Sequence, residues 1–266
     1  KAKGINPMEV IRDYWYASAL FGFRTYIDVG LGSFMFGTAI TMGNSAQMVA
    51  SGEVRQTALM LSEFIRGLVM GAANGLNLLG TGDYHRLPEF MDSMNNMTDV
   101  KSHGADVFEH FWRNNQGWKK LAGAPAITKR MIVALDSIGG TGTRNAAIIY
   151  SAFLRKDQEA MAKAEAIADR ENAKRAWAQA NAEHGTNYAF DSFSLRSNWL
   201  DVQRRQREIL EEGITEEVLQ AATDLGKLAG LNSIPQGIPG HIYRFATRLP
   251  WIVRSTTGLL FMRSAM

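Results

Sequence analysis

The stretch Val54–Leu79, VRQTALMLSEFIRGLVMGAANGLNLL, carries the clearest helical pattern in the chain. Glycines recur at every fourth position of its second half, at Gly67, Gly71 and Gly75. Small residues at this spacing let two helix backbones approach closely, so we expect a helix–helix contact there, with a lipid-facing contact as the alternative. The larger apolar residues are three or four positions apart, which predicts one apolar stripe facing the core. The stripe is Val54, Ala58, Leu61, Ile65, Leu68, Ala72 and Leu76.

The segment before this helix is unusually free of charge. No charged residue occurs from Val29 to Gly52, and the apolar part, Val29 to Met42, is interrupted by glycines and hydroxyl residues. A spanning helix needs about 20 strongly apolar residues, so we predict no transmembrane segment here. The run is a candidate for a buried helix, or for one that is buried in one state and lipid-facing in another.

A second glycine cluster, Gly139–Arg144 (GGTGTR), follows a predicted helix over 126–138. Glycine disfavours a helix interior, so we expect a break there, with the helix resuming near Thr143. A phosphate-binding loop is the alternative interpretation, but the segment lacks the GxxxxGK[ST] order and no strand precedes it.

The C-terminal half continues as helices. Residues Ala160 to Ala182 form an alanine-rich stretch with alternating charges, which predicts a long, lightly packed helix. Helices over 198–212 and 215–229 follow. No stretch alternates with period two, so the predicted fold is all-α without a sheet. The residues expected in the core are Leu61, Ile65, Leu68, Phe108, Phe111, Ile148, Ile149, Phe153 and Leu225.

We expect an elongated assembly of helices in two lobes that meet near residues 117–125. The first lobe, residues 1–122, is apolar and glycine-rich, and the second, residues 123–266, is alanine-rich and basic. Because the sequence begins at Lys1, we expect it to be part of a longer chain.

The net charge of +3 is small for 266 residues, but its placement is uneven. No acidic residue follows Asp224, whereas basic and aromatic residues continue to the end. This pattern suits DNA phosphates or anionic lipid, although it also fits a solvated helical end. The candidate contact residues are Arg244, Arg248, Arg254, Arg263 and Trp251.

Little in the sequence indicates enzyme chemistry. The chain has no cysteine, which excludes a disulfide framework and a thiol nucleophile. His103, Asp106 and His110 could share one helix face, but no second ligand-bearing segment accompanies them, so we predict no metal site. Neither a GxSxG motif nor an ordered Ser/His/Asp set is present. We therefore expect no catalytic residue and no cofactor.

The order of helix types resembles the large internal virion proteins, also called ejection or polyvalent proteins, of short-tailed phages (podoviruses). The resemblance is carried by Arg12–Phe34, which runs from an aromatic helix into a glycine-rich apolar one. It continues through Leu135-Asp136 and Arg144–Arg155 to the alanine-rich helix, and ends in the basic, aromatic segment Ile238–Met266. The Gly139–Gly142 cluster departs from the unbroken helix expected in those proteins.

The resemblance implies a structural protein that forms a ring of identical copies on the portal side of the capsid interior. Its implied partners are itself, the other internal virion proteins and the portal, then DNA and the host membrane. It would move from the virion interior to the host cell envelope and contribute to a conduit for DNA. Two alternatives stay open: an accessory helical module of a giant virion-carried RNA polymerase or peptidoglycan hydrolase, and a membrane-associated helical protein.

Overall fold

The computed structural model describes residues 23–82, 119–156 and 158–229, and these residues form an all-α fold. Within these ranges the chain contains helices and turns and no strand. The helices are α2 (Phe23–Ala50), α3 (Val54–Thr81), α6 (Lys119–Arg155), α7 (Gln158–Ala168), α8 (Arg170–Glu183), α9 (Ser197–Glu211) and α10 (Glu216–Ala229).

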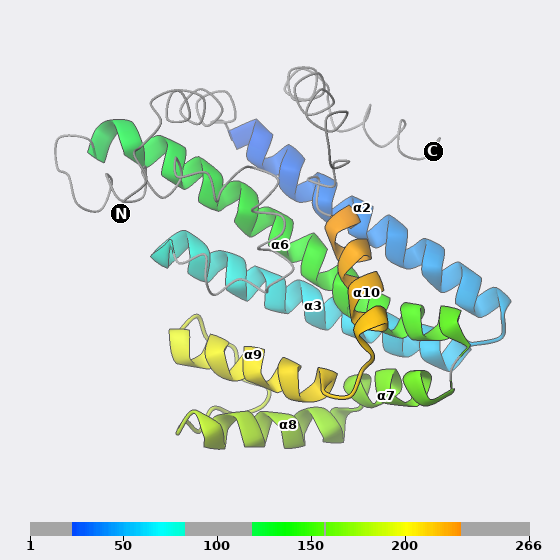
Figure 1. The fold of residues 1–266 in the computed structure, drawn as a ribbon. Helices are drawn as coiled ribbons and strands as arrows, with labels where there is room; N and C mark the ends of the chain where they lie inside the picture. Colours follow the sequence, from blue (N-terminus) through cyan, green and yellow to red (C-terminus); the bar gives the residue numbers. More distant parts are fainter. Residues whose placement is uncertain (1–22, 83–118, 157, 230–266) are drawn as a thin grey trace, which may run out of the picture.

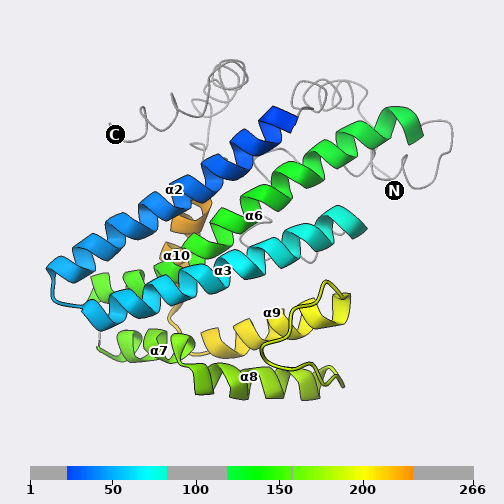
Figure 2. The ribbon, with the colours of Figure 1, turned by 180° about the vertical axis from the view of Figure 1, so that it is seen from behind.

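Helix α6 is the element around which the others are arranged (Figure 1). Helices α2 and α3 flank it, and α10 crosses it on the side that faces the viewer in Figure 1. Figure 2 shows the opposite side, where α2, α6 and α3 lie in front and α10 lies behind them. Helices α7, α8 and α9 lie along the other flank of α3.

Helices α3 and α6 approach backbone to backbone because the three glycines of α3 face α6. A Cβ added at Gly67 would lie 2.6 Å from the Thr141 carbonyl oxygen, and one at Gly75 would lie 2.7 Å from the Ala134 carbonyl oxygen. At Gly71 it would overlap the carbonyl oxygen of Ser137. The Ser137 hydroxyl also donates to the Gly71 carbonyl oxygen at 2.8 Å, which joins the two helices by a hydrogen bond.

The glycine cluster of α6 serves the contacts with α2 and α10 in the same way. A Cβ added at Gly139 would lie 2.5 Å from the Ser33 carbonyl oxygen of α2. One added at Gly226 of α10 would lie 2.8 Å from the Arg144 Cβ and 3.0 Å from the Gly140 carbonyl oxygen. Three neighbours therefore pack on α6 through small residues, and close packing of this kind gains dispersion energy along the whole contact.

The expected helix break at residues 139–142 is therefore wrong. Helix α6 runs without interruption through this cluster. A glycine in a helix interior costs about 1 kcal/mol relative to alanine, and the tight contacts that only glycine permits offset that loss. From residue 119 onward, the region near residues 117–125 where the two lobes are expected to meet is part of α6. The expected lobe boundary at 122/123 falls inside this helix.

The apolar stripe of α3 also points in a direction opposite to the prediction. Ile65, expected in the core, is 62% exposed, and Val54 and Leu76 are exposed as well. The face that packs inward carries the glycines together with Met60 and Phe64. The rule that the apolar stripe of a helix faces the core places the bulkiest residues inward, whereas the contact between α3 and α6 requires the smallest residues there.

Several other residues expected in the core are buried or partly buried. Ile148 and Ile149 are fully buried in the main hydrophobic cluster, which confirms their prediction. Leu68, Phe153 and Leu225 are partly buried and pack against the same cluster. Leu61 is half-buried. Phe108 and Phe111 lie outside the described residues.

The alanine-rich stretch forms two helices instead of one rod. Asp169 adopts an extended conformation between α7 and α8, and its carboxylate accepts a hydrogen bond from the Asn172 backbone N–H at 2.8 Å. This contact is a typical helix N-cap, and it starts α8 anew. The stretch is also packed more closely than predicted, because Ala164, Ile167 and Trp177 are buried.

The glycine contact between α3 and α6 leads to the first prediction. We expect Gly71→Ala to destabilise the protein by about 2 kcal/mol, because the new methyl group meets the α6 backbone and overpacking of this kind outweighs the gain in helix propensity. The midpoint of thermal unfolding should fall by roughly 5 °C, measured by circular dichroism.

Gly43→Ala is the matched control. Gly43 also lies inside a helix, and an added Cβ there meets nothing within 4 Å. This variant should be as stable as the wild type or more stable, by up to about 1 kcal/mol. Equal thermal midpoints for the Gly71 and Gly43 variants would contradict the close approach of α3 and α6.

Candidate functional site

Helix α2 exposes five large apolar side chains and buries several small polar ones, while Met48 is buried in the main core. Its inward positions hold Gly37, Ser33, Thr41 and Ser45, which face the bundle. The exposed residues follow helical spacing along the opposite side, and Met42 is 60% exposed. They are Leu31, Phe34, Met35, Met42 and Val49.

Helix α3 buries the glycines that face α6 together with Met60, Phe64, Met70 and Leu78, and it exposes other large residues. The exposed residues are Val54, Ile65, Val69 and Leu76. We use the name outer apolar face for these four residues together with the five exposed residues of α2. No ionised group lies on α2 between residues 29 and 50, so on that helix the face is uncharged. Several large exposed apolar residues on two neighbouring helices are typical of a contact with another macromolecule or with lipid.

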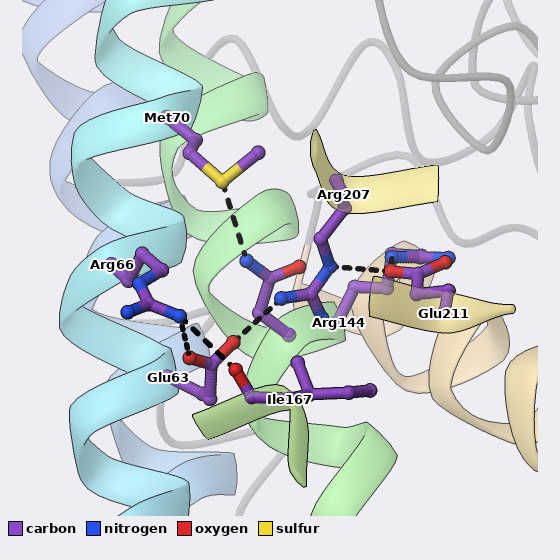
Figure 3. Close-up of polar contacts among 8 residues, drawn as sticks. Glu63, Arg66, Met70, Arg144, Ile167, Arg207 and Glu211 are labelled. Carbon is purple, nitrogen blue, oxygen red and sulfur yellow. Dashed lines mark hydrogen bonds and ion pairs between the residues drawn. The ribbon is translucent and has the colours of Figure 1, made fainter. Parts of the chain in front are cut away.

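The other flank of α3 carries a buried chain of ion pairs, which Figure 3 shows in close-up. Glu63 is fully buried, and its carboxylate accepts hydrogen bonds from Arg66 Nη1 at 2.7 Å and from Arg207 Nη1 at 2.6 Å. Arg207 Nε then donates to Glu211 Oε1 at 2.5 Å. Arg144 donates to both oxygens of Glu211, at 2.5 and 2.7 Å. The chain therefore connects α3, α9 and α6.

Each charge in the chain is held by an opposite charge. Burial by itself would raise the pKa of Glu211, but the Arg207 charge and the hydrogen bonds from Arg144 lower it to about 2. Burial would likewise lower the pKa of Arg207, but the charges of Glu211 and Glu63 raise it. Three arginines against two glutamates leave one excess positive formal charge in the chain of ion pairs.

The glycine cluster of α6 does not form an anion site. Gly139–Arg144 lies in the middle of a long helix, where the backbone N–H groups are engaged in the helix itself. Gly139, Gly140 and Thr143 are buried against neighbouring helices. The weaker phosphate interpretation of this sequence is therefore wrong.

The remaining sequence-based candidates fall mostly outside the described residues. This applies to the basic and aromatic group Arg244, Arg248, Trp251, Arg254 and Arg263, and to His103, Asp106 and His110. Gly67, Gly71 and Gly75 are described, and all three lie against α6. Across residues 23–82, 119–156 and 158–229 no group of three or more metal-binding side chains comes together. Among the helices of these ranges, none is long and apolar enough to span a membrane.

The ion-pair chain is the feature that sequence reasoning missed. Two signals pointed to it: Glu63 and Arg66 interrupt an otherwise apolar helix, and Arg207 and Glu211 stand at i and i+4 on α9. Neither signal shows that the two pairs contact each other, because they are more than 140 residues apart in the chain. No family model, curated protein or solved structure matches this chain.

The low pKa of Glu211 leads to the second prediction. A carboxylate whose pKa is lowered by folding stabilises the protein above its ordinary value of 4.5, and that stabilisation is lost as the pH falls toward about 2. We expect the wild type to lose up to about 3 kcal/mol more unfolding free energy than Glu211→Gln between about pH 5 and about pH 2.5. Urea unfolding followed by tryptophan fluorescence measures this difference.

Glu208→Gln provides the comparison for this experiment. Glu208 lies one turn earlier on α9 and forms an exposed pair with Arg205. The unfolding free energy of Glu208→Gln should change with pH as that of the wild type does. Parallel profiles for the wild type and Glu211→Gln would show that Glu211 does not contribute in this way.

Proposed function

We propose that this chain is a structural, self-assembling helical protein, and specifically an internal virion (ejection) protein of a short-tailed phage. It acts without catalysing a reaction. Identical copies form a ring inside the capsid on the portal side, beside other internal virion proteins. After ejection the protein contributes to a conduit for DNA through the host cell envelope.

The observation that carries this proposal is the outer apolar face. Exposed Ile65, Val69 and Met42 are large and apolar, although the bundle has a hydrophobic core of its own that includes Met60 and Phe64. A protein that functions alone in water gains stability by placing its large residues inside. Leaving these further large residues outside the core is favourable when another copy covers the outer face.

Polar groups beside this face favour a protein partner over lipid. Arg55 is 78% exposed next to Val54, and Ser62 is exposed on α3. Moving an exposed charge such as that of Arg55 into hydrocarbon is costly, whereas protein interfaces combine an apolar centre with a polar rim.

The resemblance of the helix order to the internal virion proteins supports the viral part of the proposal. The basic, aromatic end of the chain suits the proposed encounter with DNA or with anionic lipid after ejection, through Arg244, Arg248 and Arg254.

A membrane-associated protein is the second candidate, because small residues inside and large apolar residues outside also characterise helices packed in lipid. Co-sedimentation of the purified chain with liposomes, without other proteins, distinguishes the two candidates. Binding through the outer apolar face in the absence of self-assembly would favour the membrane candidate.

Self-assembly gives the third prediction. Mass photometry of protein purified without detergent should show a discrete multimer of the 29.5 kDa chain. The double variant Ile65→Gln/Val69→Gln should shift the population toward the monomer, because it places two polar amides on the outer apolar face. Its thermal midpoint should stay within a few degrees of the wild type, since both side chains are exposed in the isolated fold.

Leu228→Gln controls for the loss of an exposed apolar side chain elsewhere. Leu228 is exposed on α10, which crosses α6 on the side that faces the viewer in Figure 1 and is hidden behind α6 in Figure 2. This variant should assemble as the wild type does. A wild-type protein that stays monomeric at micromolar concentration would contradict the proposed function.

A further inference from the structure

Helices α8 and α9 form a hairpin with a hydrophobic cluster of its own. Trp177 and Trp199 pack edge to face with ring centroids 5.9 Å apart, and Trp177 Nε1 donates to the Tyr188 carbonyl oxygen at 2.7 Å. Phe190 packs against Trp177 from the connecting loop. In the described part of the chain, Ala73 of α3 is the one residue outside the hairpin in this buried cluster.

The hairpin meets the rest of the fold, the bundle of α2, α3, α6, α7 and α10, through buried ion pairs as well as through apolar contacts at Ala73 and Leu210. Arg207 and Glu211 of α9 are one helical turn apart and match Glu63 of α3 and Arg144 of α6. Figure 3 shows the α9 pair lying between the two bundle charges. A hydrogen bond from Asn77 Nδ2 of α3 to a loop carbonyl oxygen, at 3.2 Å, adds to the contact.

Relative to an apolar contact of the same size, a charged contact of this kind holds a defined position but adds little net stability. The attraction between buried ion pairs is largely offset by the loss of their hydration. Within the described residues Arg207 Nη2 finds no hydrogen-bond partner, which weakens docking further. Leu210 supplies a partly buried aliphatic contact with the main core.

Short breaks bound the hairpin on both sides. Asp169 is extended between α7 and α8, and Gly213 has a positive φ of 85° between α9 and α10. Helix α7 before the first break belongs to the main core through Ala164 and Ile167. Changes in backbone angles at two such positions are sufficient for a rigid-body movement of the segment between them.

We propose that the α8–α9 hairpin is a releasable arm, latched to the bundle by the Glu63–Arg207–Glu211–Arg144 ion pairs, which undocks as a unit while the bundle stays folded. This conformational device does not depend on the proposed assembly or on its viral setting. Release exposes the flank of α3 that bears Glu63, Ala73 and Asn77.

The latch is tested with a double variant, Arg207→Met/Glu211→Gln, in the full-length chain. It removes both charged links of α9 while retaining side-chain length. Arg207→Met is the milder second variant, because Glu63 then keeps Arg66 and Glu211 keeps Arg144. The matched control is Glu208→Gln, which removes an exposed charge from the same helix and leaves the Arg205–Glu183 pair between α9 and α8 in place.

Two measurements separate undocking from unfolding. The chain has no native cysteine, so cysteines introduced at exposed Ser62 of α3 and exposed Ala178 of α8 accept spin labels selectively. Electron–electron distance measurements then report the position of the arm. Hydrogen exchange of the α6 core around Ile148 and Ile149 reports whether the bundle is intact.

We expect the label distance to become longer and broader in the double variant, to change less in Arg207→Met, and to stay unchanged in the control. Exchange in the α6 core should remain as slow as in the wild type. An unchanged distance in the double variant would overturn the latch. Loss of α6 protection together with the distance change would also overturn it, because the hairpin and the bundle would then form one cooperative unit.

Discussion

The structure depends on the contact between the α3 and α6 backbones. Gly67, Gly71 and Gly75 bring α3 onto the carbonyl groups of α6, and Gly139 and Gly226 do the same for α2 and α10. Any side chain larger than hydrogen at these points requires one helix to move. The small residues therefore set the distances between the helices, and the distances in turn decide which faces remain for larger residues.

This constraint accounts for the two other main features of the molecule. Where α2 and α3 touch α6 they hold small residues, Met60 and Phe64 fill the core beside these contacts, and other large residues such as Met42 and Ile65 lie outside. On its remaining flank α3 carries Glu63, and a buried carboxylate needs charged partners, which α9 supplies with Arg207. One helix thus has a packed face, an apolar outer face and a charged face.

The sequence predicts the all-α class and most helices well, because hydrophobic period and capping are local properties. It predicts the wrong inward face for α3. The spacing of apolar residues shows that Ile65 and Leu76 share a face, but it does not show that the face with the glycines packs more tightly against α6. It also interprets Gly139–Gly142 as a break, because helix propensity ignores the packing that glycine permits. The Glu63–Arg207 pair joins residues distant in the chain, so only the fold reveals it.

The central claim is that the outer apolar face becomes covered by another copy of the chain. A single cysteine placed at Ile65, in a chain that otherwise has none, tests it through the rate of thiol labelling without detergent. We expect labelling of the cysteine at Ile65 to slow as the protein concentration rises, whereas a cysteine placed at Leu228 should react equally fast at every concentration. Concentration-independent labelling at Ile65, at the rate of a fully exposed thiol, would contradict it.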